Sequence, residues 1–160
     1  MTVTVDQTNQ NFLKVYVDDY CKAITKNYRD YHNDRGYTPR ENLMKFEARI
    51  GRNYYKVVQC EYDEQMGEYR DRSVHSFVGK TKKNLGNVYK PASWKAPHTK
   101  HVRYSFCNEK DFRFLLDSRN LDWAGGYLYF MEKNVIRCSC HCVNNFNFNR
   151  PLCLQSPQLK

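Results

Sequence analysis

The sequence has no apolar run long enough to cross a membrane, since a span needs roughly 18 such residues. Its first ten residues, MTVTVDQTNQ, lack both the basic start and the apolar stretch of a secretory signal. These absences predict a soluble cytoplasmic protein without a membrane partner. In that reducing compartment the seven cysteines are expected to be free thiols, and their odd number and irregular spacing match no disulfide framework.

Motifs of known enzyme chemistry are also missing. The chain has no nucleotide-binding glycine loop, no Gly-x-Ser-x-Gly turn, no His-Glu-x-x-His helix and no spaced acidic pair. Asp18-Asp19 and the acidic residues of 117–122 show no spacing that favours a metal-dependent nuclease. The sequence therefore predicts a protein that is not an enzyme and uses no cofactor. A metal-dependent enzyme remains an alternative.

Two groups of residues are candidates for metal ligands. The richest is the run Cys138, Cys140, His141 and Cys142, with Cys153 beyond it. These candidate ligands are adjacent in sequence or separated by one residue. Structural zinc takes Cys pairs separated by two to four residues, so that each chelate loop can close. We therefore predict no metal there.

The second group is a set of histidines. His98 and His101 are three residues apart, and His75 and Cys107 lie in the same strongly basic stretch. A positive field repels a cation, and no neighbouring carboxylate in the sequence is available to orient the rings. Packing, or binding that changes with pH, is the expected role of these histidines.

Acidic residues are absent between Asp71 and Glu109. Eight of the 26 basic residues lie in this interval, which leaves 18 basic and 17 acidic residues in the rest of the chain. The net charge of +9 is therefore concentrated in residues 72–108. Charge localised in this way attracts polyanions and steers their approach.

Aromatic residues are interleaved with these charges, and such a mixture is typical of surfaces that bind single-stranded nucleic acid. The alternation of a strand, with rings in the core and lysines in water, gives the same mixture, and a basic surface also suits an acidic protein partner. The predicted nucleic-acid-binding residues are Lys80, Lys82, Lys83, Tyr89, Lys90, Trp94, Lys95, Lys100 and Arg103.

An amphipathic helix is expected over residues 9–31. Its apolar residues recur at steps of three and four; they are Leu13, Val17, Tyr20, Ile24 and Tyr28. Most of the stability of such a helix comes from burying its apolar stripe, so we expect it to cover a sheet. Thirteen Tyr against two Trp also suit a small domain whose core lies close to its surface.

Short strands are expected after this helix. Strict alternation predicts a strand over residues 44–50, and residues 54–60 return after the turn Gly51-Arg52-Asn53. The other expected elements are a helical turn at 39–42, a loop or short helix at 61–72, strands at 74–78, 87–90 and 102–106, an extended stretch at 91–101, a helix at 108–117 and a last strand after Gly125-Gly126.

The predicted fold is an α+β domain over residues 1–130, a small antiparallel sheet of four to five strands covered by the N-terminal helix. Residues 131–160 are expected to form a weakly ordered C-terminal extension.

Four segments carry a resemblance to a known group: GRNYYKVVQ, RSVHSFVGK, GNVYKPASWKAP and KHVRYSF. They resemble small uncharacterised proteins of tailed bacteriophages and of viral sequences from aquatic environments, over roughly residues 43–106 and most specifically at 86–97. That group has no assigned activity, so the resemblance implies a viral accessory protein and carries no catalytic residue. Two departures fall where a ligand is expected: the lysine loop at 80–85 is longer than usual, and His98-Thr99 replaces the usual single small residue after Pro97.

Together these features predict a small, basic, non-enzymatic viral accessory protein that binds nucleic acid through residues 72–108 in the cytoplasm of its host. The same features leave open a protein-interaction or structural role, as a virion component or as a factor that binds an acidic host protein.

Overall fold

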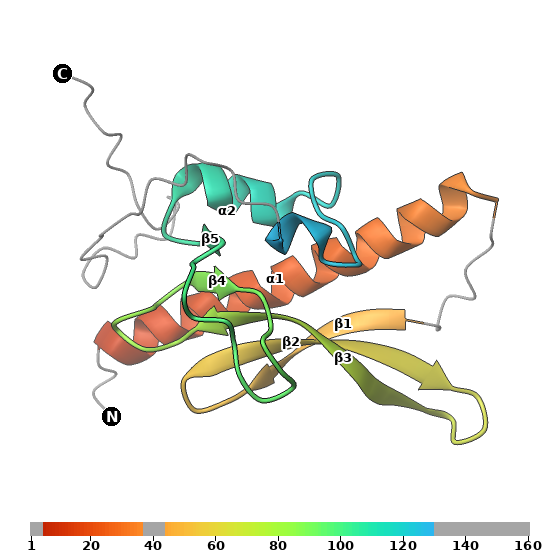
Figure 1. Cartoon of the computed structure of the whole chain (residues 1–160), viewed down its shortest axis with the longest axis horizontal. Helices are drawn as coiled ribbons and strands as arrows, with labels where there is room; N and C mark the ends of the chain where they lie inside the picture. Colours follow the sequence, from red (N-terminus) through yellow and green to blue (C-terminus); the bar gives the residue numbers. More distant parts are fainter. Residues whose placement is uncertain (1–4, 37–43, 130–160) are drawn as a thin grey trace.

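A five-stranded antiparallel sheet and a long helix across one of its faces dominate residues 5–36 and 44–129, the parts that the computed structural model describes (Figure 1). Each strand pairs with the next along the chain, so the strand order is β1-β2-β3-β4-β5. The predicted α+β class is confirmed. The elements are α1 (Val5–Asp34), β1 (Met44–Ile50), β2 (Tyr54–Asp63), β3 (Glu68–Gly79), β4 (Asn87–Tyr89), β5 (Tyr104–Ser105), α2 (Glu109–Leu116) and the 3-10 helix η1 (Gly126–Leu128).

Helix α1 buries the predicted apolar stripe against the sheet. Leu13, Val17, Tyr20 and Ile24 are all fully buried, while the opposite side of the helix carries exposed ion pairs between residues three or four apart. The helix is longer than the predicted 9–31 at both ends. It ends just before Gly36, whose φ of 71° glycine adopts without strain.

Residues 61–63 and 68–72 belong to strands β2 and β3, so the prediction of a loop or short helix over 61–72 was wrong except at the turn of residues 64–67. The charged side chains that favoured a loop pair across β2 and β3 instead: Arg70 binds Asp63 at 3.2 Å. The rings of Tyr62 and Tyr69 lie 5.3 Å apart on the same two strands. Cross-strand pairs of this kind stabilise a hairpin, which here turns within residues 64–67.

The sheet has two different faces because alternate residues of a strand point in opposite directions. Tyr55, Val57, Val78 and Val88 belong to the core beneath α1. Their chain neighbours Tyr54, Phe77 and Tyr89 therefore point to the other face, where the rings of Phe77 and Tyr89 each lie 6.1 Å from that of Tyr54. We call this side, away from α1, the outer face.

The chain between β4 and β5 folds back on itself instead of running extended as predicted. Pro91 and Pro97 form an antiparallel bridge, and the backbone N–H groups of Ala92 and Ser93 both bind the Ala96 carbonyl. Proline cannot donate to a ladder, so the strand ends at Tyr89 and the hairpin that follows has few backbone bonds of its own. This hairpin carries Trp94.

The end of the described chain packs beside α1. Asn108 caps α2 by accepting hydrogen bonds from the N–H groups of Lys110 and Asp111. The strand expected after Gly125-Gly126 is instead η1, because Tyr127 and Leu128 are both buried and cannot alternate between core and water. The expected helical turn at 39–42 and the extension at 131–160 lie outside the described residues.

Candidate nucleic-acid interface

Two turns at the same end of the sheet come together through Lys80. Its backbone N–H binds the Asn53 carbonyl at 3.0 Å, and its Nζ donates to the Gly51 carbonyl at 2.9 Å. The register that pairs Tyr54 with the last residue of β3 causes this proximity. Arg52, at the tip of the β1–β2 turn, therefore lies beside the lysine loop that joins β3 to β4.

The lysine loop has a defined shape. The Asn84 side chain accepts hydrogen bonds from both the N–H and the hydroxyl of Thr81. The backbone of Asn84 approaches Gly79 so closely that a Cβ there would lie 2.1 Å from the Asn84 carbonyl oxygen, and only glycine fits. Lys82 and Lys83 are exposed at the tip between these two anchors.

Trp94 lies on the outer face and is not covered by α1. It is 45% exposed, and the ammonium group of Lys56, a residue of β2, lies 4.7 Å from its ring centroid. A cation over an indole face is favourable. This contact also places the positive charge of Lys56 beside an aromatic surface that faces water. Lys95 follows Trp94 directly and is exposed.

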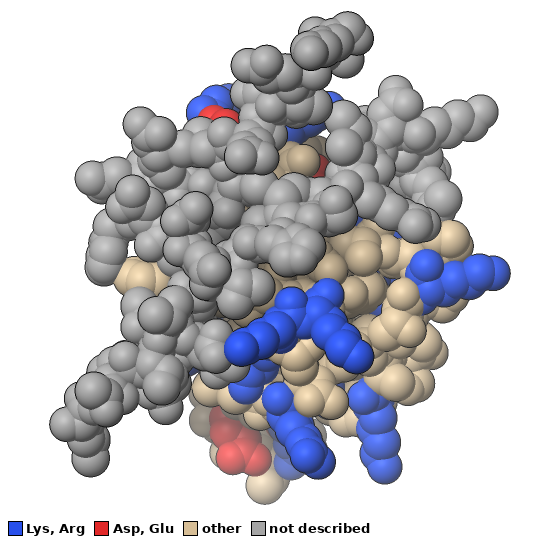
Figure 2. All heavy atoms as spheres, turned by 90° about the vertical axis from the view of Figure 1, so that its left-hand side faces the viewer, with Lys and Arg blue, Asp and Glu red and all other residues tan. Residues whose placement is uncertain are grey.

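Positive charge gathers at this end of the molecule. Figure 2 looks at the end that carries the two turns and shows Lys and Arg side chains close together over the described surface. Among the described residues, the structure pairs none of Lys80, Lys83 and Lys95 with a carboxylate. We define the basic face as Arg52, Lys56, Lys80, Lys82, Lys83, Trp94 and Lys95.

The structure divides the predicted binding residues into three groups. Lys80, Lys82, Lys83, Trp94 and Lys95 are on the basic face. The other two lysines lie elsewhere: Lys90 is against the ring of Tyr129, at 4.9 Å, and Lys100 is exposed in the turn that follows the hairpin.

Tyr89 and Arg103 are buried, at 5% and 9% exposure. Because both side chains are buried, the basic face does not include them. Tyr89 packs on the outer face because it belongs to β4, where the ring of Tyr54 contacts it. Tyr89 is buried because it lies in β4, a short strand between β3 and β5. The charged residues around it in the sequence do not affect this burial.

Arg52 and Lys56 belong to the basic face although neither lies in residues 72–108. The predicted hairpin of residues 44–60 contained the signal that would have found them. The turn of this hairpin must lie near the end of the strand that pairs with residues 54–60. In the structure that strand is β3.

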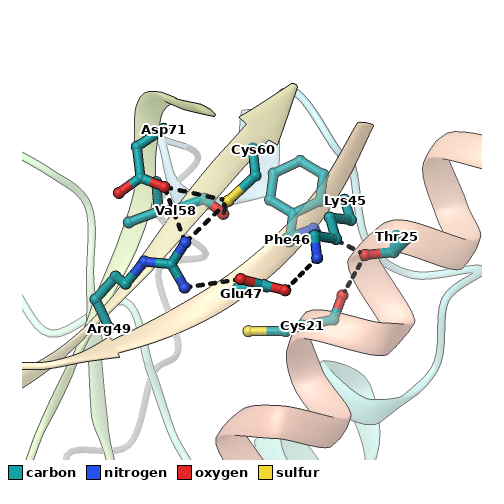
Figure 3. Close-up of polar contacts among 9 residues, drawn as sticks. All are labelled: Cys21, Thr25, Lys45, Phe46, Glu47, Arg49, Val58, Cys60 and Asp71. Atoms are coloured by element: carbon teal, nitrogen blue, oxygen red, sulfur yellow. Dashed lines mark hydrogen bonds and ion pairs between the residues drawn. The ribbon is translucent and has the colours of Figure 1, made fainter. Parts of the chain in front are cut away.

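A second polar group, on β1, β2 and β3, includes a thiol and four charged side chains (Figure 3). Arg49 donates to Asp71 at 2.9 Å and to Glu47 at 2.7 Å. Lys45 binds the other oxygen of Glu47 at 2.5 Å. The Cys60 thiol donates to the Asp71 carboxylate at 3.4 Å. Opposite charges therefore join β1 to β3, and the thiol joins β2 to the same group.

The thiol in this group is not prepared for nucleophilic chemistry. Burial, followed by the hydrogen bond to Asp71, raises the pKa of Cys60 to about 11, so the thiolate is scarce at neutral pH. Hydrogen bonds from Arg49 lower the pKa of Asp71, and hydrogen bonds from Lys45 and Arg49 lower that of Glu47. Both carboxylates are therefore held as anions in ion pairs, and the group stabilises the sheet.

Near this group, α1 protects the edge of the sheet. The Thr25 hydroxyl donates to the Cys21 carbonyl and accepts from the backbone N–H of Phe46 at 3.0 Å, also drawn in Figure 3. An unpaired edge N–H is a site for unwanted strand pairing. The side chain of a helix residue thus satisfies a donor of edge strand β1.

Metal ligands do not gather in the described part of the chain: no group of three or more His, Cys, Asp or Glu side chains there is arranged to hold an ion. Cys138, Cys140, His141 and Cys142 lie outside it. No helix among the described residues combines the length and the apolar character that a membrane crossing requires.

Comparison with known families gives one match, over residues 1–130, to the family of unknown function DUF7717. The chain belongs to this family. The matched range is also the range of the predicted α+β domain, and it contains the whole basic face. No curated protein and no solved structure matches this DUF7717 chain.

Proposed function

We propose that this DUF7717 protein binds single-stranded nucleic acid on its basic face and catalyses no reaction. The observation that supports this most directly is the position of Trp94, half exposed between Lys56 and Lys95 on the outer face. Base stacking on an aromatic ring, combined with cations that contact the backbone, is how proteins bind single strands without reading their sequence.

The form of the nucleic acid follows from the same geometry. A duplex hides the faces of its bases, so an exposed indole adds little to duplex binding, whereas a single strand can stack a base on it. The cations contribute through the release of counterions, which depends on salt and not on sequence. We therefore expect a preference for single strands over duplexes of the same length.

Salt dependence tests the proposal. The basic face has six cations, and if all six contact phosphates, the slope of log K against log salt is about −4 for a single strand. The measurement is fluorescence anisotropy of a labelled oligonucleotide of about 12 nucleotides, with a duplex and polyglutamate as competitors. Affinity that does not change with salt contradicts the proposal, and stronger competition by polyglutamate than by unlabelled oligonucleotide favours an acidic protein partner instead.

Replacing Trp94 with Ala is expected to weaken single-strand binding by about 10-fold, because one base loses its stacking surface. Trp94→Phe keeps a ring and should lose much less. Trp123→Phe is the matched control, since Trp123 packs against Tyr28 beside α1, away from the basic face. Equal affinities of the Trp94→Ala variant and the unmodified protein would exclude stacking at this position.

The cellular role that we propose is that of a viral accessory protein in the host cytoplasm, and its support is the sequence resemblance described above. Cys21 and Cys60 are free, buried thiols, which fits a reducing compartment.

A further inference from the structure

A guanidinium group with unpartnered donors is buried just before β5. Arg103 is 9% exposed, and its Nε and Nη1 atoms are buried without a hydrogen-bond partner. Removing a charge from water without a counter-ion or an acceptor is strongly unfavourable, and native proteins rarely leave such donors unsatisfied. This side chain therefore needs an acceptor that the described residues do not supply.

His98 also has an unpartnered nitrogen, and its backbone lies beside the C-terminal end of β4. Its Nδ1 atom is buried without a partner. The backbone N–H of His98 binds the Lys90 carbonyl at 2.9 Å, and the backbone N–H of Arg103 binds the Val88 carbonyl at 2.8 Å. The acceptors are Val88 in β4 and Lys90 just after it, so the backbones of both residues with unpartnered side chains are bonded to one short stretch of chain.

The surroundings favour an anion over a cation. Residues 72–108, which include both β4 and β5, contain no acidic residue. The Asp111 carboxylate of α2 reaches β5, but it accepts the backbone N–H of Ser105 at 3.0 Å. Lys90 and Lys100, close in sequence to the two residues, add to the positive field.

We propose that Arg103 and His98 bind a phosphate-type oxyanion. In the planar guanidinium, Nη1 and Nη2 form a fork that matches two oxygens of a phosphate, and an imidazole N–H can donate to a third. The phosphate has two possible sources, a free phosphate ion or the backbone of a bound strand. In the second case this site extends the proposed nucleic-acid binding and rests on it; in the first it stands alone.

The test begins with inorganic phosphate added to the full chain, with chloride at the same ionic strength as the reference. Calorimetry should show saturable binding, and the melting temperature should rise with phosphate. Arg103→Met, which keeps an unbranched apolar stem, should abolish the phosphate response, and Arg103→Lys, which loses the fork, should weaken it at least 10-fold. Arg29→Met is the matched control, because Arg29 is exposed on α1 and lies outside the basic face, and should respond like the unmodified protein.

The same variants, measured with a single-stranded oligonucleotide, identify the source of the phosphate. A response to phosphate alone identifies the free ion. No response to phosphate, together with oligonucleotide binding that Arg103→Met weakens at least 10-fold, identifies the strand. Oligonucleotide binding that Arg103→Met leaves intact, with no saturable phosphate binding, overturns this site but not the proposed function. If Arg103→Met does not fold, His98→Ala decides between the same outcomes.

Discussion

Removal of three charges from the basic face should weaken single-strand binding about 100-fold at 0.1 M salt. Each phosphate contact contributes about 0.7 to the slope of log K against log salt, so three lost contacts account for about 2 log units at that concentration. The variant is Arg52→Gln, Lys83→Gln and Lys95→Gln, three exposed residues from the three segments that build the face. The slope itself should become less steep by about 2, and anisotropy at several salt concentrations measures both quantities.

A charge-matched variant separates a local surface from net charge. Lys22→Gln, Lys26→Gln and Arg29→Gln lowers the net charge by the same three units, from +9 to +6, but removes exposed charges from α1, on the other side of the sheet. If binding depends on the basic face, this variant should retain nearly all of its affinity. Equal losses in the two variants would show that only total charge matters, and the basic face would then have no special role.

The composition of the basic face shows what a sequence can predict about such a surface. The lysine loop and Trp94 were predicted because charge density and aromatic content are properties of the chain. Arg52 and Lys56 were missed because they join the face only through strand pairing, 24 or more residues away from the lysine loop in sequence. Pairing partners depend on non-local contacts, which periodicity in a single sequence does not specify.

Burial sets two of the predicted residues apart from the basic face. Tyr89 and Arg103 have the residue types of binding positions, and composition alone could not separate them from their exposed neighbours. Their surroundings follow from the short strands β4 and β5 and from the hairpin between them. The predicted extended course of that hairpin hid this, because an extended stretch leaves most of its side chains in water.

The fold itself was predictable where the apolar residues of a segment follow one clear period, either that of a helix or that of a strand. The helical stripe of α1 and the alternation of β1 each identify an element, and the structure confirms both, although in β1 Met44 and Phe46 are buried and Ile50 is exposed. The prediction after Gly125, and the prediction at 61–72 outside the turn of residues 64–67, were wrong for one shared reason. Local residue types favoured a loop and a strand, but cross-strand ion pairs at Arg70 and burial of the Tyr127 ring against α1 decided the structures.

A buried chain of hydrogen bonds joins α1, β3 and η1 through Tyr20, Ser76, His75 and Tyr127. His75 Nε2 lies 3.3 Å from the backbone carbonyl of Asp122, which can only accept, so this nitrogen carries the proton of the neutral ring. His75 Nδ1 therefore accepts from the Ser76 hydroxyl. That hydroxyl oxygen in turn accepts from Tyr20, whose own oxygen accepts from Tyr127. The order of donors is thus fixed by one carbonyl at the end of the chain.

This arrangement should make the stability of the protein fall in mild acid. Burial lowers the pKa of His75 to about 4, from an ordinary value of about 6.5 in the unfolded chain. Between these two values the unfolded state binds the proton and the folded state does not, so the free energy of unfolding falls as the pH drops from about 6.5 to about 4. The loss due to this one residue is about 3 kcal/mol, since each pKa unit corresponds to about 1.4 kcal/mol.

Urea unfolding at several pH values between 7 and 4, on the unmodified protein and on His75→Gln, measures this loss. Glutamine keeps one donor for the Asp122 carbonyl and has no charge to gain, so its stability at pH 7 is expected to be lower while its dependence on pH is weaker. Other carboxylates, including Asp71, lose their ion pairs at low pH in both proteins, and their contribution therefore cancels in the difference. The difference should close by about 3 kcal/mol as the pH reaches 4. Parallel curves across this range would mean that His75 is protonated without cost in the fold, which burial among Tyr20, Phe46 and Tyr127 argues against.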